Sequence, residues 1–264
     1  MKRTAFVLMT LITLAGCATV PEKTRSVVFY PPLPQRPRLQ FLHAITGEEN
    51  IGKSQGAFSE FLLGKPTSDK RIGKAWDIAS SDGKIYVLDR RYKRLLIIDL
   101  VLREFDYLKD QRMGALDDPS GIWVTADDVK YIADMGRKQI VVFGADNEFL
   151  RSYGEPDLFE KPVDVAVYEN TVFVSDMVKN ILFALDKASG NLKLTIGEQG
   201  QDKGQFSKPT HVVVDRQGSI YVTDAFNFRV QKFDPQGKFV KSYGFLGDAF
   251  GAFARPKGLD VDRD

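Results

Sequence analysis

Two carboxylates and one imidazole occupy equivalent places in copies of a repeated sequence pattern. Asp77, Asp164 and His211 each lie two residues beyond the start of an apolar segment. If the copies are arranged around an axis, these three side chains converge at the mouth of a central channel. They could then bind a ligand, hold an oxygen-preferring ion such as Ca²⁺, or only hydrogen-bond to neighbouring backbone. Nothing in their spacing requires an ion, so we predict neither a metal nor a cofactor.

The repeat is marked by four look-alike apolar strands that each end in an aspartate, at Asp89, Asp134, Asp176 and Asp224. A second marker opens another apolar strand in each copy, at Pro119, Pro162, Pro209 and Pro256. Both markers recur about every 45 residues, and self-similarity at such a period indicates one supersecondary unit that buries its faces against its neighbours.

Each period contains four short extended segments, which are clearest at residues 122–124, 131–133, 140–143 and 149–153. The segments are rich in β-branched and aromatic residues and are bounded by Gly, Asp, Asn or Pro. Four short strands in about 45 residues is the size of a β-propeller blade. The sequence therefore predicts an all-β propeller of four-stranded antiparallel blades.

The fourth copy carries a family resemblance. Lys208–Asp215, Gly218–Asp224, Asn227–Asp234 and Gly237–Gly244 together resemble an NHL repeat, and the resemblance extends over residues 39–264. It implies a six-bladed propeller when the ring is complete.

Only part of such a ring is expected in this chain. Four full blades are followed by Arg255–Asp262, which reads as the first strand of a fifth blade. We therefore expect more sequence beyond residue 264, and we expect an open ring to self-associate through its uncovered apolar faces.

The N-terminal region has the layout of an export signal. Residues 1–16 place Lys2 and Arg3 before a short apolar stretch, and Leu14-Ala15-Gly16-Cys17 resembles a bacterial lipobox. The resemblance implies cleavage before Cys17 and lipidation of its thiol, which would anchor the chain in a membrane. Ala18 favours sorting to the outer rather than the inner membrane, on its periplasmic or surface side.

A proline-rich stretch separates this lipidation site from the propeller. Residues 17–38 are expected to form an extended tether without a core pattern, and residues 39–264 to form the propeller. The segment Leu39–Ile45 predicts a strand, which we expect to be the outer strand of the last blade and to close the ring.

The charge balance argues against a nucleic-acid partner. The chain has 37 Lys and Arg against 35 Asp and Glu, and residues 1–16 contain two of these basic residues and no acidic one. The remainder is formally neutral and lacks the positive field that binding to a phosphate backbone requires. The basic clusters in residues 70–74 and 90–94 are interpreted as solvated surface.

Strand directions place three elements on one face: the start of each first strand, the loop between strands two and three, and the connector between blades. Besides Asp77, Asp164 and His211, this face is predicted to present basic and aromatic side chains at Arg91, Tyr92, Arg137, Phe226 and Phe228. Such a rim suits a protein or small ligand with apolar and acidic parts.

The strand-terminating aspartates are interpreted as structural. Asp89 and Arg94 share a spacing of five residues with Asp224 and Arg229, across the turn between the second and third strands. This spacing predicts ion pairs or turn caps. Asp134 and Asp176 occupy the same place in the other two blades, and none of these aspartates is predicted to be catalytic.

We interpret the chain as a lipid-anchored recognition or scaffold module rather than an enzyme. The alternative is a metal-dependent lyase- or hydrolase-like propeller, because the resemblance extends to peptide-amidating lyases, in which histidines at this channel position hold zinc. Only His211 occupies such a place here, and the other histidine, His43, is on the segment expected to close the ring. One imidazole is too few for a three-histidine zinc site. A third possibility is a purely structural envelope component.

Overall fold

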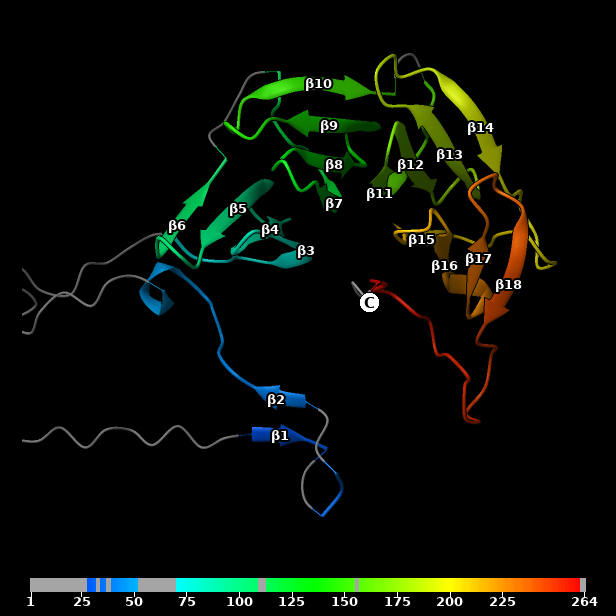
Figure 1. Ribbon diagram of the computed structural model, residues 1–264, viewed down its shortest axis with the longest axis horizontal. Coiled ribbons are helices and arrows are strands. Elements are labelled where there is room, and N and C mark those ends of the chain that lie inside the picture. The colour runs from blue at the N-terminus through cyan, green and yellow to red at the C-terminus, as the bar shows by residue number, and fades with distance from the viewer. Residues whose placement is uncertain are drawn as a thin grey trace, which may run out of the picture. The chain divides into compact units, whose positions relative to one another are not determined.

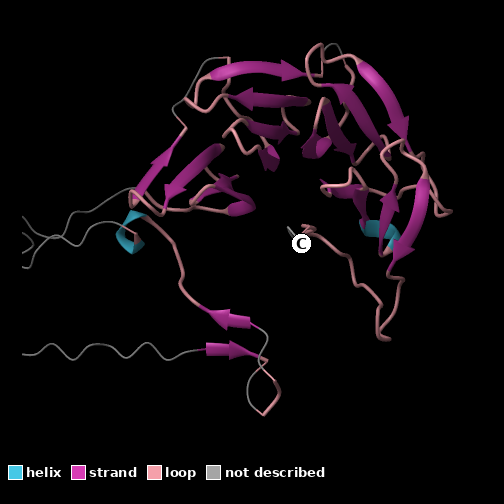
Figure 2. Ribbon diagram, viewed as in Figure 1, coloured by secondary structure: helices cyan, strands magenta, loops and turns pink. Residues whose placement is uncertain are grey.

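In the computed structural model, nearly all the regular secondary structure of the described residues is β-strand (Figure 2). The only helices among the described residues are two single 3₁₀ turns, η1 (Glu48–Asn50) and η2 (Ala225–Asn227). Two compact units are present, residues 1–44 and residues 45–264. The structure describes residues 28–31, 34–36, 39–51, 70–108, 113–154 and 157–261. Among them, no helix has the length and apolar content needed to cross a membrane.

The first unit contains a small hairpin in which β1 (Val28–Tyr30) pairs antiparallel with β2 (Leu39–Phe41). The sequence did not predict a strand at residues 28–30, where a β-branched residue and two aromatics favour one. All three side chains of this strand are exposed, and the tether role of residues 17–38 stays a prediction. The strand expected at residues 39–45 is present but shorter, and its described strand partner is β1. Closure of the ring by this segment stays a prediction. The signal at residues 1–16 and Cys17 lie outside the described residues.

The second unit consists of four antiparallel sheets of four strands each, in which neighbouring strands follow the chain order (Figure 1). Blade 1 has β3 (Ala75–Ser81), β4 (Lys84–Asp89), β5 (Arg94–Asp99) and β6 (Glu104–Tyr107). Blade 2 has β7 (Pro119–Val124), β8 (Lys130–Asp134), β9 (Gln139–Phe143) and β10 (Phe149–Tyr153). Blade 3 has β11 (Pro162–Tyr168), β12 (Thr171–Asp176), β13 (Ile181–Asp186) and β14 (Leu192–Ile196). Blade 4 has β15 (Pro209–Val214), β16 (Ile220–Asp224), β17 (Arg229–Phe233) and β18 (Phe239–Tyr243).

Within this unit the four sheets follow one another along an arc, with the first strand of each sheet innermost and the fourth outermost (Figure 1). This arrangement confirms the predicted all-β propeller of four-stranded antiparallel blades. The strand predicted at residues 255–262 is absent from its described part, residues 255–261. No strand among the described residues pairs with this segment, and an isolated extended segment leaves its backbone groups unpaired.

Hydrophobic cores lie between successive blades. Tyr86 and Leu88 of blade 1 pack with Ile132 and Val141 of blade 2 in one buried cluster, and similar clusters join blades 2 and 3 and blades 3 and 4. The central strands of blades 2 and 3 are apolar on both faces because each of these two sheets packs against a neighbouring blade on either side. A fully buried side chain of this size stabilises the fold by about 1.5–3 kcal/mol, so packing between blades holds the arc together.

Candidate functional site

The loop face predicted from the strand directions is held together by the strand-terminating aspartates. The carboxylate of Asp134 accepts hydrogen bonds from the backbone N–H groups of Asp117 and Asp118 in the connector, at 2.7 and 2.9 Å. It also accepts from Gly136 and Arg137 in the following turn, each at 3.0 Å. One fully buried carboxylate therefore joins the connector to the turn between strands two and three. Asp89 and Asp176 make equivalent sets of bonds.

Asp224 caps its connector differently. Its Oδ1 accepts from the Ser207 N–H at 2.7 Å, while its Oδ2 pairs with Arg229 Nε at 2.9 Å. In blade 1 the corresponding Arg94 lies 3.9 Å from Asp89. The ion pairs and caps expected from the five-residue spacing are thus present.

A cation from each of these turns also reaches the connector carbonyls. Arg137 Nη1 donates to the carbonyl oxygens of Met113 and Ala115, at 2.9 and 2.7 Å. Arg94, Lys179 and Arg229 make the same kind of bond in the other blades. Arg137 was predicted to bind a ligand. In the structure its guanidinium holds the connector in place, a role that the sequence did not predict. Ligand binding by Arg137 stays a prediction.

Asp77 and Asp164 connect the inner strands of adjacent blades. Asp77 accepts hydrogen bonds from the N–H groups of Ile78 and of Ile122, the latter on β7, each at 2.9 Å. Asp164 accepts from the N–H of Val212 on β15, also at 2.9 Å. The sequence left open whether these carboxylates bind a ligand or only backbone. Backbone bonds are present for both, and ligand binding stays a prediction.

The two carboxylates and His211 also interact electrostatically across the inner strands. Burial raises the pKa of Asp77, although two backbone hydrogen bonds and the charge of His211 oppose the shift. Burial raises the pKa of Asp164 further, and the Asp77 charge adds to the effect. Burial lowers the pKa of His211, and the charge of Asp77 partly offsets this shift.

His211 Nδ1 is buried and has no hydrogen-bond partner among the described residues. Within the same residues, no group of three or more His, Cys, Asp or Glu could hold a metal ion.

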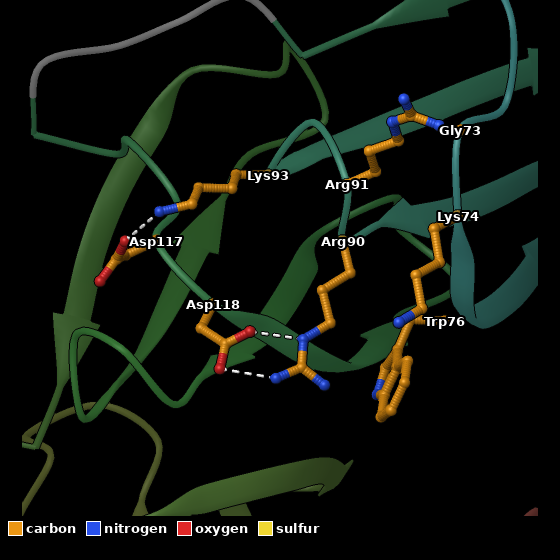
Figure 3. A pocket seen from close by; sticks show the side chains of 8 residues that line it. All are labelled: Gly73, Lys74, Trp76, Arg90, Arg91, Lys93, Asp117 and Asp118. Carbon is orange, nitrogen blue, oxygen red and sulfur yellow. Dashed lines mark hydrogen bonds and ion pairs between the residues drawn. The ribbon is translucent and has the colours of Figure 1, made fainter.

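A pocket of about 730 Å³ lies on the loop face where blades 1 and 2 meet. The side chain of Arg90 is central to it. Its guanidinium forms a fork with the carboxylate of Asp118, with Nη2 2.7 Å from Oδ2, and lies 4.3 Å from the centre of the Trp76 ring (Figure 3). The sequence did not predict this pocket, because the basic cluster at residues 90–94 was interpreted as solvated surface. The pocket is lined by Gly73, Lys74, Trp76, Arg90, Arg91, Lys93, Asp117 and Asp118.

The remaining predicted face residues are aromatic or lie beside an aromatic ring. Tyr92 is 49% exposed, and the guanidinium carbons of Arg91 and Arg94 lie 5.7 and 4.7 Å from its ring centre. Phe226 is 45% exposed at the far end of the arc, with Lys208 Nζ 4.6 Å from its ring centre.

Phe228 differs from these exposed aromatics because it is partly buried and ends η2. Its backbone has a left-handed φ of 55°. The structure therefore gives this residue a place in the turn between β16 and β17.

Comparison with known proteins supports the fold. A model of a 6-bladed beta-propeller family matches residues 154–246. A catalytically inactive variant of virginiamycin B lyase from Staphylococcus aureus, solved with quinupristin, superposes with a TM-score of 0.53 at 14% identity, over 73% of this chain and 60% of that one. This likeness and the family model agree on a propeller.

Two animal proteins are similar over part of the chain. A probable peptidyl-alpha-hydroxyglycine alpha-amidating lyase of Caenorhabditis elegans is 27% identical over 113 residues, which is 41% of this chain and 32% of that protein. The peptidylglycine alpha-amidating monooxygenase of Rattus norvegicus is 32% identical over 130 residues, which is 46% of this chain and 13% of that protein. The matched region is therefore less than half of each protein.

Proposed function

We propose that this propeller is a recognition module that binds a protein or ligand through its loop face. The observation that carries the proposal is that exposed aromatic rings on this face, Trp76, Tyr92 and Phe226, each have a cation over the ring. Aromatic and arginine side chains are enriched in binding interfaces, where they supply most of the binding energy. Exposed rings of this kind are otherwise costly to leave in water.

We also propose that the module works at a membrane surface. The lipobox-like sequence that ends at Cys17 supports export and lipid anchoring, with the outer membrane as the destination. Residues 17–38 would then separate the anchor from the propeller, so that its loop face can reach a partner in the envelope.

Capture of partners from envelope extract tests the binding proposal. The full-length protein would be compared with the triple variant Trp76→Ala, Tyr92→Ala, Phe226→Ala. A matched triple variant removes equally exposed apolar side chains from outer strands, at Leu150, Leu192 and Val240. We expect the loop-face variant alone to lose a captured partner. Equal capture by both variants would refute the proposal.

A metal-dependent lyase is the second candidate. Two observations favour it. Among the described residues, the buried Nδ1 of His211 has no hydrogen-bond partner, and the Asp77 charge acts on this imidazole. The chain is also similar to a protein named as a probable peptidyl-alpha-hydroxyglycine alpha-amidating lyase. Calorimetry with Zn²⁺ and an assay with a peptidyl-α-hydroxyglycine test it. We expect no tight zinc, because one well-placed imidazole supplies too few ligands. Stoichiometric zinc that His211→Ala abolishes, together with turnover, would establish the enzyme instead.

A further inference from the structure

We infer that the pocket between blades 1 and 2 binds the side-chain carboxylates of an acidic peptide segment. This inference rests on the proposed function, since it names the partner chemistry for one part of the loop face. Three features of the pocket support it: an excess of cationic side chains, two ion pairs in its wall, and the indole of Trp76 beside them.

Two ion pairs form the fixed wall of the pocket (Figure 3). Arg90 pairs with Asp118 through Nε and Nη2, and Lys93 pairs with Asp117. The backbone N–H groups of Asp117 and Asp118 are both held by the buried carboxylate of Asp134. Because the wall is anchored to the blade core, Arg90 is held in place before a ligand arrives, which lowers the entropy cost of binding.

A surplus of positive charge remains after these pairs. The pocket has four cationic side chains and two carboxylates in its lining. Among the described residues, no carboxylate lies within 4.0 Å of the Lys74 ammonium or the Arg91 guanidinium, and Arg90 Nη1 has no hydrogen-bond partner. These groups are donors without an anionic acceptor, and carboxylates are the acceptors that form the strongest hydrogen bonds with them.

Two of these cations lie close to the indole ring of Trp76. Arg90 lies 4.3 Å and Lys74 Nζ 5.3 Å from its ring centre, and the backbone N–H of Arg90 donates to the Lys74 carbonyl at 3.0 Å. Attraction between each cation and the ring keeps the charges together despite their mutual repulsion. The side chain of Trp76 is still 49% exposed, so an apolar neighbour of the bound carboxylate can pack on it.

The size of the pocket favours a peptide over a single small anion. Its volume of about 730 Å³ is largely open to solvent, which suits a segment of several residues lying across the surface better than a single small anion. The cations are also spread over the turn at residues 90–93 and the connector at residues 73–74. Two carboxylates separated by one residue in an extended peptide can therefore meet different cations.

Tryptophan fluorescence of the full-length chain provides a direct assay. The chain has two tryptophans, so Trp123→Phe leaves Trp76 as the reporter. The probe is a capped hexapeptide with alternating Glu and Leu, compared with otherwise identical Gln-Leu and Lys-Leu peptides. We expect saturable change in Trp76 emission with the Glu peptide, at least tenfold weaker binding of the Gln peptide, no binding of the Lys peptide, and weaker binding at high salt.

Charge-matched variants locate the binding. Lys74→Gln with Arg91→Gln is expected to weaken Glu-peptide binding at least tenfold. Lys238→Gln with Arg216→Gln removes the same formal charge from turns outside the pocket lining and is expected to leave binding within about twofold. Thermal melting of each variant confirms that it is folded.

Three results would overturn the inference: equal binding by both variant pairs, equal affinity for the Gln and Glu peptides, or a response to inorganic phosphate or phosphatidylglycerol vesicles without one to the Glu peptide. Capture from envelope extract separates this failure from failure of the proposed function. If capture of a partner requires Trp76, Tyr92 and Phe226 but the Glu peptide does not bind in the pocket, only the peptide inference is refuted. If capture is unchanged when these three rings are removed, the proposed function is refuted.

Discussion

Oδ2 of Asp77 accepts a hydrogen bond from the N–H of Ile122, and the two residues lie on the inner strands of successive blades, 2.9 Å apart at these atoms. Asp164 and Val212 repeat the relationship at the same distance between blades 3 and 4. Between blades 2 and 3 the equivalent place is Gly121, where a Cβ would collide with the Asp164 carboxylate. The inner strands of blades 2 and 3 are instead joined by this close backbone approach and by the Ser120 hydroxyl, which donates to the Pro162 carbonyl at 3.3 Å.

Loss of the acceptor at Asp164 should destabilise the fold. Asp164→Ala leaves the buried N–H of Val212 without its side-chain acceptor, and we expect the free energy of unfolding to fall by about 1–3 kcal/mol. Asp164→Asn keeps one accepting oxygen and should cost less. Urea denaturation of the two variants measures the difference. Equal losses would show that packing, rather than the hydrogen bond, sets the cost.

The same carboxyl should make stability depend on pH. The pKa of Asp164 is raised well above 3.8 by burial and by the charge of Asp77. The folded protein therefore keeps a proton that the unfolded chain has released, so this group's contribution is complete below pH 3.8 and is lost as pH rises through the raised folded pKa. Asp164→Asn should flatten that part of the stability curve, as followed by urea midpoints between pH 3 and 7. An unchanged curve would contradict the assignment.

Asp128 should make the pH dependence of stability run in the opposite direction to that from Asp164. Burial raises its pKa, but hydrogen bonds from Lys84, Tyr86 and Lys130 outweigh burial and leave the pKa below 3.8. The unfolded chain therefore takes up the proton first, and the stabilisation present above pH 3.8 is lost as pH falls through the folded pKa. Asp128→Asn should reduce stability at pH 7 more than at pH 3. The same urea series measures it, and equal losses at both pH values would count against this sign.

The Asp134 cap should be more costly to remove than an exposed turn cap. Asp134→Ala deprives four backbone N–H groups of their acceptor, and we expect a loss of about 3 kcal/mol or more. Asp99→Ala removes a carboxylate that accepts from Val101 and Leu102 in an exposed turn and should cost about 1 kcal/mol or less. Chemical denaturation compares them. Similar losses of stability would mean that water accepts hydrogen bonds from the backbone N–H groups of the connector when Asp134 is absent.

Anchoring is tested at Cys17. If the lipobox-like sequence is processed, the parent chain should label with a palmitate analogue in a bacterial host. Cys17→Ser should remain an unlabelled precursor, since serine has no thiol to acylate. Ala18→Gly, which keeps the thiol, serves as the control. Equal labelling of Cys17→Ser and the parent would exclude lipidation at this residue.

The blade architecture could be predicted because its signals are local. Asp89, Asp134, Asp176 and Asp224 each end a strand with buried apolar residues, and each carboxylate accepts a hydrogen bond from the turn that follows in the same blade. The hairpin strand β1 was not predicted because Val28–Tyr30 is only three residues long and lies among prolines, which are typical of an extended tether. The pairing of that strand depends on Leu39–Phe41, across a turn that the composition did not specify.

The candidate site could be predicted only in part because its contacts join different blades. The places of Asp77, Asp164 and His211 on the first strands of their blades follow from the repeat register. The backbone N–H that donates a hydrogen bond to Asp77 or to Asp164 belongs to the next copy of the repeat. Arg90 and Asp118 are likewise separated by 28 residues, so no local pattern shows that they pair.

The bonds from Asp77 and Asp164 also have a consequence for how such repeats diverge. Each carboxylate recognises a backbone N–H, which every residue except proline carries. The side chain at the donating position is therefore free of this constraint, and Ile122 and Val212 can change without loss of the bond. Only proline at either place would break it. A duplicated or exchanged blade can therefore form this hydrogen bond with a new neighbouring blade without any matching change in the neighbour's side chains.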